Sequence, residues 1–375
     1  MGARNPIVFV LFTSLVFVMM VIYTYSSPGI KSTNPRTKNF ARSQNKQHLK
    51  ISTNESVPKS CYKCNRFKCK LLEDNNLKEL HCRQRLPQLF NIGAKKSGTT
   101  TLRKFMDLHP SLAGISFRLE SWDEDKHIHD IADLITKEMY YTTPKQITFQ
   151  NNPDFFSFDM RTLKRLAPLL NDNVPLIMLF RDPVHRALSD YVHVKEMIGL
   201  RPDLVHTEWR KTTMTTNNDE KKEKVQFYKT YEIRDTFEST VLDENGDVRS
   251  DNQLIDTGVY VKHVTSYLDT FKLKQMLFLD GELFKKDPLP ILREVENFLK
   301  IPGFYQAKHF QYVKEKGFHC AFVEDRPDVN CMDFTKGRQH PQVNGAVLDK
   351  LTSFYRPYTI QLQNIIGKTF SWVDS

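Results

Sequence analysis

Short, continuously apolar runs alternate with helical patterns along most of the chain. The clearest runs are Leu89–Ala94 and Pro175–Phe180, and Gln146–Phe149 and Gln275–Leu279 are further candidates. Continuous apolar runs of this length are typical of parallel strands covered on both faces. Helical spacing of apolar residues predicts helices between them, at Thr100–Leu108, Met160–Leu170, Val184–Met197, Val259–Phe271 and Pro288–Leu299. This alternation predicts an α/β fold with a central parallel sheet flanked by helices, which binds ligands at the carboxyl ends of its strands.

The first 85 residues follow a different pattern. Ile7–Tyr23 is an uncharged apolar run, about as long as the shortest bilayer-spanning segments of roughly 17 residues. A cleaved signal peptide is the alternative, but no small-x-small cleavage site follows the run. We therefore expect a cytoplasmic tail at 1–6, a single transmembrane signal-anchor at 7–25, a lumenal stem with a Cys-rich collar at 26–85, and a globular domain at 86–375. One signal disagrees, because basic residues are more numerous after the run than before it, which favours the opposite orientation.

The cysteines and a glycosylation sequon favour the lumenal placement. Asn54 begins an Asn-Glu-Ser acceptor triplet, and six cysteines, an even number, fit an oxidising compartment. Four of them, Cys61, Cys64, Cys69 and Cys82, precede the main domain. The Cys61-x-x-Cys64 spacing is compatible with zinc or redox chemistry. Because the paired second half of a zinc ribbon is missing, the sequence favours disulfides.

Charge narrows the class of partner. The net charge of +10 and the isoelectric point of about 9.1 favour an anionic partner, which can be nucleic acid, an acidic membrane surface or an acidic glycan. A merely soluble basic protein is the competing interpretation. The polar stretch Thr212–Lys224 is expected to be a mobile surface insertion.

Two segments carry the candidate chemistry. In the first, Gly93 and Gly98 bracket a basic turn between a strand and a helix, and such a turn offers backbone N–H groups to an anion, with Lys95 and Lys96 adding charge. The spacing matches the P-loop of nucleotide triphosphatases, but Thr99 stands where that motif has lysine. The second segment, Leu179–Tyr191, continues from a strand through Arg-Asp-Pro into a helix. Its Asp182 can hold Mg²⁺ in principle, but Asp before Pro is more typical of a helix N-cap.

These two segments resemble the cofactor signatures of Golgi sulfotransferases that use 3′-phosphoadenosine 5′-phosphosulfate (PAPS). The tail is also similar, with Lys316–Cys320, Cys331, Lys336–Val343 and a terminal Thr-Phe-Ser-Trp in the same order. The order is most similar to that of the heparan sulfate glucosaminyl 3-O-sulfotransferases. The resemblance covers residues 86–375 and implies the sulfotransferase α/β fold, with a P-loop-like phosphate site.

The resemblance assigns roles position by position. Lys96 and the loop that includes Lys95, Ser97, Gly98, Thr99, Thr100 and Thr101 would hold the 5′-phosphosulfate. Arg181 and Ser189 would bind the 3′-phosphate. The Lys336-Gly337-Arg338 loop would close over the nucleotide, with Phe318 near the adenine and a Cys320–Cys331 disulfide beneath the loop. Each residue also has a plainer interpretation, as a solvated, helical or surface side chain.

The acceptor side departs from the family pattern. The glutamate that serves as base in these relatives aligns with Arg118, whereas Glu120 lies two residues away and Asp123 matches the family aspartate. Residues two apart in a strand share a face, so Glu120 is the candidate base, with a substrate-positioning role as the alternative. Asn151 stands where the family has a lysine that contacts the reacting sulfate, and Thr100 replaces a frequent arginine. Catalytic roles are therefore expected for Glu120, Lys96 and Asp123, and acceptor binding for Arg118 and Asn151.

The sequence thus predicts a single-pass Golgi membrane sulfotransferase with a lumenal catalytic domain. It would transfer sulfate from PAPS to a hydroxyl of an anionic, heparan sulfate-like glycan, without a metal and without a nucleic acid partner. The alternatives are a different glycan or small-molecule acceptor, or a catalytically weak homologue that binds nucleotide and glycan. A nucleotide kinase is a more distant alternative.

Overall fold

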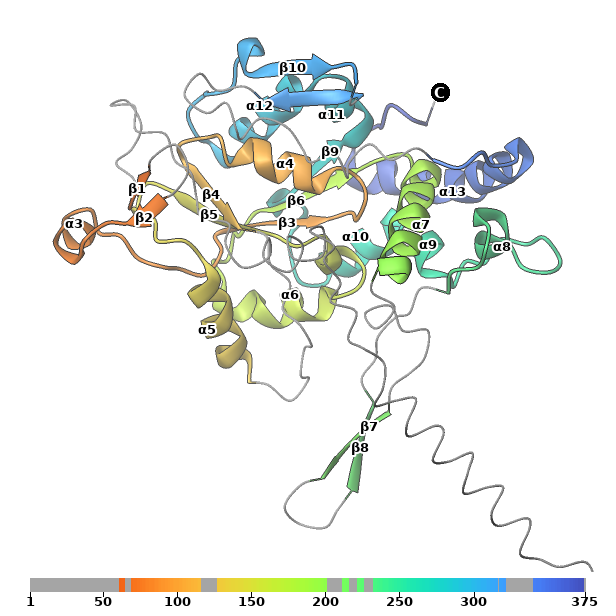
Figure 1. The fold of residues 1–375 in the computed structure, drawn as a ribbon, viewed down its shortest axis with the longest axis horizontal. Coiled ribbons are helices and arrows are strands. Elements are labelled where there is room, and N and C mark those ends of the chain that lie inside the picture. Colours follow the sequence, from red (N-terminus) through yellow and green to blue (C-terminus); the bar gives the residue numbers. More distant parts are fainter. Residues whose placement is uncertain are drawn as a thin grey trace, which may run out of the picture. The chain divides into compact units, whose positions relative to one another are not determined.

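A parallel β-sheet forms the centre of the domain (Figure 1). The computed structural model describes residues 61–64, 69–115, 127–200, 211–215, 221–225, 232–315, 317–321 and 340–373. Within these ranges the largest sheet has five strands in the order β4-β5-β3-β6-β9, and every neighbouring pair is parallel. Its strands are β3 (Leu89–Gly93), β4 (Leu112–Ile115), β5 (Ile147–Asn151), β6 (Leu176–Phe180) and β9 (Met276–Asp280). The predicted parallel α/β sheet is therefore confirmed.

The four predicted strands correspond to β3, β5, β6 and β9, while the edge strand β4 was not predicted. Side chains of β6 alternate between two cores, with Met178 and Phe180 in one and Ile177 and Leu179 in the other. Because both faces are covered, every residue of this strand is buried. This burial explains why the strand reads as a continuous apolar run and not as an alternating one.

Helices cover both faces of the sheet (Figure 1). The core that contains Phe180 also takes side chains from α5 (Ile128–Glu138), α6 (Met160–Leu166), α7 (Pro183–Leu200), α8 (Phe237–Val241), α9 (Gln253–Asp256), α10 (Tyr260–Leu268) and α13 (Gly345–Ile366). The core that contains Leu179 takes them from α4 (Thr99–Met106), α11 (Gly281–Lys286) and α12 (Pro288–Leu299). The domain is therefore a three-layer arrangement with a helical layer on each side of the sheet.

The predicted helices are present, with one interruption. The expected helix Met160–Leu170 is α6 followed by the 3-10 helix η2 (Ala167–Leu169). Pro168 lies in η2, and a proline both lacks an N–H donor and clashes with the preceding turn, so the α-helix ends before it. The remaining 3-10 helices within the described residues are η1 (Pro153–Phe156), η4 (Leu273–Gln275) and η5 (Ala307–His309).

Smaller strand pairs lie outside the central sheet. β7 (Lys211–Thr215) and β8 (Lys221–Val225) form an antiparallel pair that overlaps the stretch Thr212–Lys224, which was expected to be a mobile insertion. A second antiparallel pair consists of β10 (Phe310–Val313) and β11 (Phe318–Ala321), and α11 contacts β11.

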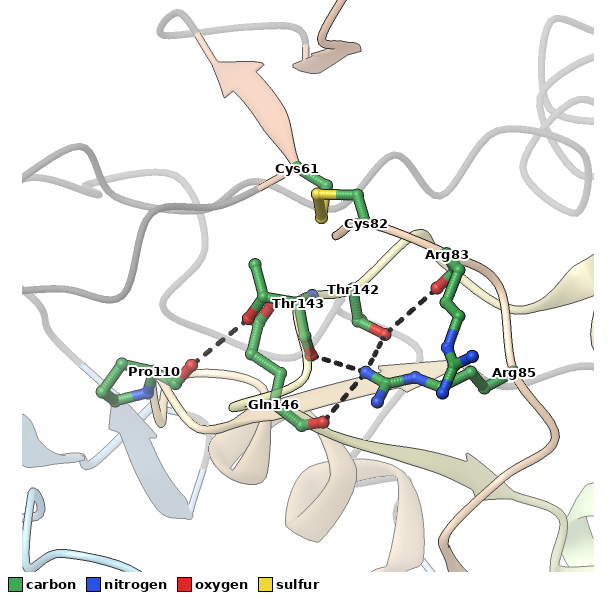
Figure 2. Close-up of a disulfide and its surroundings, with 8 residues drawn as sticks. All are labelled: Cys61, Cys82, Arg83, Arg85, Pro110, Thr142, Thr143 and Gln146. Atoms are coloured by element: carbon green, nitrogen blue, oxygen red, sulfur yellow. Dashed lines mark hydrogen bonds between the residues drawn. A yellow bond between two sulfur atoms is a disulfide. The ribbon is translucent and has the colours of Figure 1, made fainter. Parts of the chain in front are cut away.

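A disulfide closes the Cys-rich collar on itself, and an arginine connects the collar to the domain (Figure 2). β1 (Tyr62–Cys64) pairs with β2 (Cys69–Leu71), α3 (Asp74–Glu79) follows, and a disulfide joins Cys61 to Cys82. The disulfide predicted for the collar in preference to zinc is confirmed for these two cysteines. Arg85 then donates hydrogen bonds to Thr142 Oγ1 at 2.7 Å and to the carbonyl oxygens of Thr143 and Gln146 at 2.6 and 3.2 Å.

The predicted anchor at 7–25 and most of the stem, including Asn54, lie outside the described residues. Where the chain is described, no helix combines the length and apolar character needed to cross a membrane.

Candidate functional site

The order of the strands places a binding crevice at the carboxyl ends of β3 and β6. From β3 the chain continues toward β4 on one side of the sheet, and from β6 it continues toward β9 on the other. Adjacent strands whose connections leave in opposite directions create the crevice in which open parallel sheets bind ligands. Both segments with candidate chemistry, the turn after Gly93 and the segment after Phe180, begin at this point.

The turn between β3 and α4 is tied to β6 at one end and opens into a helix at the other. Ala94 N donates to Leu179 O at 2.9 Å, and Ser97 N donates to Ala94 O at 3.2 Å. Lys96 and Gly98 have φ angles of 69° and 104°, in the left-handed region that lysine seldom adopts. This backbone turns the chain sharply into α4, whose first N–H groups have no acceptor inside the helix. Such a helix N-terminus favours an anion.

Lys95 and Lys96 have different environments although they are adjacent. Lys95 is buried, and its Nζ lies 3.2 Å from Oδ1 of Asp190 on α7. Arg186 Nη1 lies 3.1 Å from the other oxygen of Asp190 and donates to Lys95 O at 3.4 Å. Burial tends to raise the pKa of Asp190, but the charges of Lys95, Arg186 and Lys96 outweigh it and hold the pKa at about 2. Lys95 therefore fixes the loop to α7, while the half-buried Lys96 is nearer the solvent.

Arg181 follows β6 and is held from two sides. Its Nε donates to Oε1 of Glu282 on α11 at 3.0 Å, and its carbonyl oxygen accepts a bond from the Tyr260 hydroxyl at 2.8 Å. Asp182 caps α7, because its Oδ1 accepts the backbone N–H of His185 at 2.7 Å and Pro183 is the first residue of the helix. The predicted capping role of Asp182 is confirmed.

α11 lies tightly against both segments. A side chain on Gly281 would place its Cβ 2.6 Å from Phe180 O and 3.1 Å from Ser97 O. Only glycine therefore allows α11 to approach this closely. Glu282, the partner of Arg181, is positioned by this contact.

Several cationic or titratable groups converge on the same side of the site. Burial lowers the pKa of His340, and the neighbouring charges of Arg181, His185, Lys285 and Lys96 lower it further. His340 is two residues after Arg338 in the sequence, and its electrostatic coupling to Arg181, His185 and Lys96 places it beside the crevice. A concentration of positive charge from four separate segments suits a ligand with more than one phosphate or sulfate group.

Asn151 lies at the carboxyl end of β5 and is buried. Its Oδ1 accepts a hydrogen bond from Asn91 Nδ2 at 2.8 Å, and the same Nδ2 lies 3.4 Å from Thr99 O. These bonds link β5 to the start of α4. The acceptor-binding role of Asn151 stays a prediction, and the structure adds a positioning role beside it.

The other predicted residues divide into two groups. Ser189 is half-buried on α7, Phe318 begins β11, and Cys320 is buried and disulfide-bonded. Arg118, Glu120, Asp123, Cys331 and the Lys336-Gly337-Arg338 loop lie outside the described residues. Their roles, including the pairing of Cys320 with Cys331, stay predictions. Within the described ranges no three His, Cys, Asp or Glu side chains are grouped to hold a metal ion.

Sequence reasoning missed several residues of this site, among them Arg186, Asp190, Glu282 and His340. The spacing of Arg186 and Asp190, four residues apart in a predicted helix, could have indicated an ion pair. No sequence pattern around Glu282 or His340 indicates a role in the site, because each reaches the neighbourhood of Arg181 from a distant part of the chain.

Comparisons with known proteins are consistent with this geometry. A family model described as a sulfotransferase domain matches residues 86–358. The human heparan sulfate glucosamine 3-O-sulfotransferases 3B1 and 3A1 are each 32% identical over 298 residues, which is 77% of this chain and 65% and 63% of theirs. The chain thus matches slightly under two thirds of the length of these two relatives. Among solved structures, a sulfotransferase from Alicyclobacillus acidocaldarius has 17% identity and a TM-score of 0.49, and the match covers 77% of this chain and 99% of that one.

Proposed function

This chain belongs to the sulfotransferase domain family, and on that premise we propose that it transfers a sulfuryl group from PAPS to a hydroxyl of a glycosaminoglycan, with heparan sulfate as the leading acceptor. The observation that carries this proposal is the position of the basic turn after β3 beside Arg181 at the end of β6. The names of the relatives supply the acceptor class. A net charge of +10 suits a polyanion.

The residues of the crevice fit the two anionic ends of PAPS. Lys96, Ser97 and the Gly98–Thr101 turn would hold the 5′-phosphosulfate, because they combine a cation with the free N–H groups of a helix start. Arg181 and Ser189 would hold the 3′-phosphate, since an arginine can donate two parallel hydrogen bonds to it. Lys336, Gly337 and Arg338 would cover the nucleotide, and Phe318 would pack near the adenine. When bound, PAPS supplies an activated sulfuryl group.

The chemistry then requires a base and a cation from this chain. Glu120 would accept the proton of the attacking hydroxyl, and Asp123 would support it. Lys96 would stabilise the charge that develops on the 5′-phosphate oxygen as its bond to sulfur breaks. Arg118 would contact the acceptor and supply a cation that Asn151 lacks. No metal is needed in this scheme.

One observation favours a second candidate function. Asn151 is uncharged, buried and bonded to Asn91, although it stands where the family has a lysine at the reacting sulfate. A chain with an intact nucleotide site and a weakened sulfate site would bind nucleotide and glycan with little turnover.

We further propose a Golgi location, with the anchor at 7–25, a stem glycosylated at Asn54 and the domain in the lumen. The Cys61–Cys82 disulfide supports an oxidising compartment. The apolar run Ile7–Tyr23 supports the anchor, and the sequon at Asn54 supports the type II orientation with a lumenal domain.

Labelled PAPS offered with a panel of desulfated and sulfated glycans tests the function of the purified full-length chain. Transfer to heparan sulfate-type acceptors is expected. Nucleotide binding without transfer to any acceptor would favour the binding homologue, and binding of ATP in preference to PAPS would favour a kinase.

Two variants test the assigned roles. Glu120→Gln should abolish transfer and leave nucleotide affinity unchanged, and retained turnover would exclude Glu120 as the base. Lys96→Met should weaken nucleotide binding. The matched control is Lys145→Met, because Lys145 is exposed just before β5, at the opposite end of the sheet.

A further inference from the structure

The first two turns of α7 expose very few side chains. From Pro183 to Asp190 only His185 is exposed and only Ser189 is half-buried, whereas the other six residues are buried. Residues four apart in a helix lie on one face, one turn above the other. His185 therefore lies on the same open face as Ser189, on the turn next to Arg181. A ligand that reaches both Arg181 and Ser189 passes this imidazole.

The surroundings of His185 orient its ring. Its Nδ1 lies 3.2 Å from Oδ1 of Asp182, the oxygen that also accepts the His185 backbone N–H, and its side chain is 59% exposed. In an imidazole bound through Nδ1, the Nε2 atom points away from that partner. Asp182 thus holds one nitrogen of the ring and leaves the other directed outward.

The charged groups around His185 come from four elements. Asp182 caps the helix that carries His185, Arg181 follows β6, Glu282 lies on α11, and His340 lies on the tail that precedes α13. Lys285 and Lys96 belong to the same cluster, because their charges lower the pKa of His340. The hydrogen bond that the His185 ring donates to Asp182 raises the pKa of His185, against the opposing effects of burial and Arg181. In turn, the bonds from His185 outweigh burial and lower the pKa of Asp182, so that carboxylate remains ionised near neutral pH.

We propose that His185 is a third ligand of the nucleotide 3′-phosphate, beside Arg181 and Ser189, and that it makes nucleotide affinity increase as the pH falls toward 6. This inference rests on the proposed nucleotide site. A phosphate near Nε2 favours the charged imidazolium, so binding takes up a proton. The affinity gained in this way is fully present below the pKa of His185 in the free protein. It is lost as the pH rises through the higher pKa of the complex.

Isothermal titration of adenosine 3′,5′-bisphosphate (PAP) into the purified full-length chain between pH 5.5 and 8 tests the proposal. The 3′-phosphate itself titrates near pH 6, and this changes the affinity of both proteins with pH. The readout is therefore the dissociation constant of His185→Gln divided by that of the unchanged protein, because the titration of the phosphate cancels in this ratio. The ratio is expected to grow from pH 8 to pH 6, by at most about tenfold for each unit by which PAP raises the pKa of His185. His129→Gln is the matched control, because His129 is exposed on α5 and is not a residue of the proposed site, and its dissociation constants should equal those of the unchanged protein at every pH.

Adenosine 5′-monophosphate, which lacks the 3′-phosphate, locates the effect. Its affinity should not distinguish His185→Gln from the unchanged protein at any pH. A PAP ratio that is constant with pH, or an equal effect on the monophosphate, would overturn the role of His185 while leaving the nucleotide site in place. A protein that binds no PAP at any pH would overturn the nucleotide site itself, and the inference with it.

Discussion

Lys95 and Asp190 form a buried ion pair, with 3.2 Å between Nζ and Oδ1, that joins the anion-binding turn to α7. Arg186 contacts the other carboxylate oxygen at 3.1 Å, so one acid is shared by two cations from the two segments of the site. The positions of Lys96 and Ser189 relative to each other therefore depend on a side chain that need not touch the nucleotide.

Asp190→Asn should destabilise the fold by about 3–5 kcal/mol, because it leaves two buried cations without their carboxylate. Chemical denaturation of the variant and of the unchanged protein measures the difference. Asp269→Asn is the matched control, since Asp269 is 72% exposed and 3.5 Å from Lys164. An exposed pair of this kind contributes at most about 1 kcal/mol. Equal stability of Asp190→Asn and Asp269→Asn would contradict the structural role of the pair.

Acid should remove the contribution of Asp190 in a defined pH range. Its pKa is about 2 in the folded chain and close to 4 when unfolded, so the folded form binds the proton less readily. The resulting stability, on the order of 2 kcal/mol, is present above pH 4 and is lost as the pH falls from about 4 to 2. The measurement is the difference in unfolding free energy between Asp190→Asn and the unchanged protein across that range. A difference that does not change between pH 6 and pH 2 would refute the low pKa.

Gly281→Ala should displace α11. The added Cβ would meet the backbone oxygens of Phe180 at 2.6 Å and Ser97 at 3.1 Å, and neither can move without distorting the site. We expect a loss of about 1–3 kcal/mol in stability. Because Glu282 moves with the helix, PAP affinity should also fall several-fold.

Gly345→Ala is the control for that change. Gly345 begins α13, and no heavy atom lies within 4 Å of the added Cβ. The stability of the Gly345→Ala variant should equal that of the unchanged protein or be slightly higher. The prediction fails if both alanine variants melt at the same temperature as the unchanged protein.

Arg85→Ala should loosen the collar from the sheet. The guanidinium donates three hydrogen bonds to Thr142, Thr143 and Gln146, two of them to carbonyl oxygens of the turn before β5 (Figure 2). Removal should cost about 1–3 kcal/mol and expose this turn to hydrogen exchange. Lys145→Ala on the same turn is the control, because Lys145 is exposed. Unaltered exchange of residues 142–146 in Arg85→Ala would show that the collar is held in another way.

The parts of the fold that the sequence predicted depend on local signals. The strands β3 and β6 are continuous apolar runs because both faces are buried, and Asp before Pro marked the start of α7. β4 has only four residues, too few for a pattern. α13 contains Pro357, which interrupts its helical signal.

The site was predictable only where one segment defines it. The anion-binding turn and Arg181 follow from their own segments. The opposite environments of Lys95 and Lys96 depend on the left-handed backbone at Lys96, which spacing does not reveal. Glu282 reaches Arg181 only because β9 pairs with β6, a long-range contact.

The strand order also determines when this chain can fold during synthesis. β3 is the first strand of this sheet to be synthesised, but its neighbours in the sheet are β5 and β6, which are synthesised later. The edge strand β9 is complete only at Asp280. Parallel pairings between such distant segments form slowly and leave apolar strands exposed meanwhile. A nascent chain interrupted before Asp280 would present the unpaired edge of β6, which makes such chains candidates for chaperone retention and aggregation.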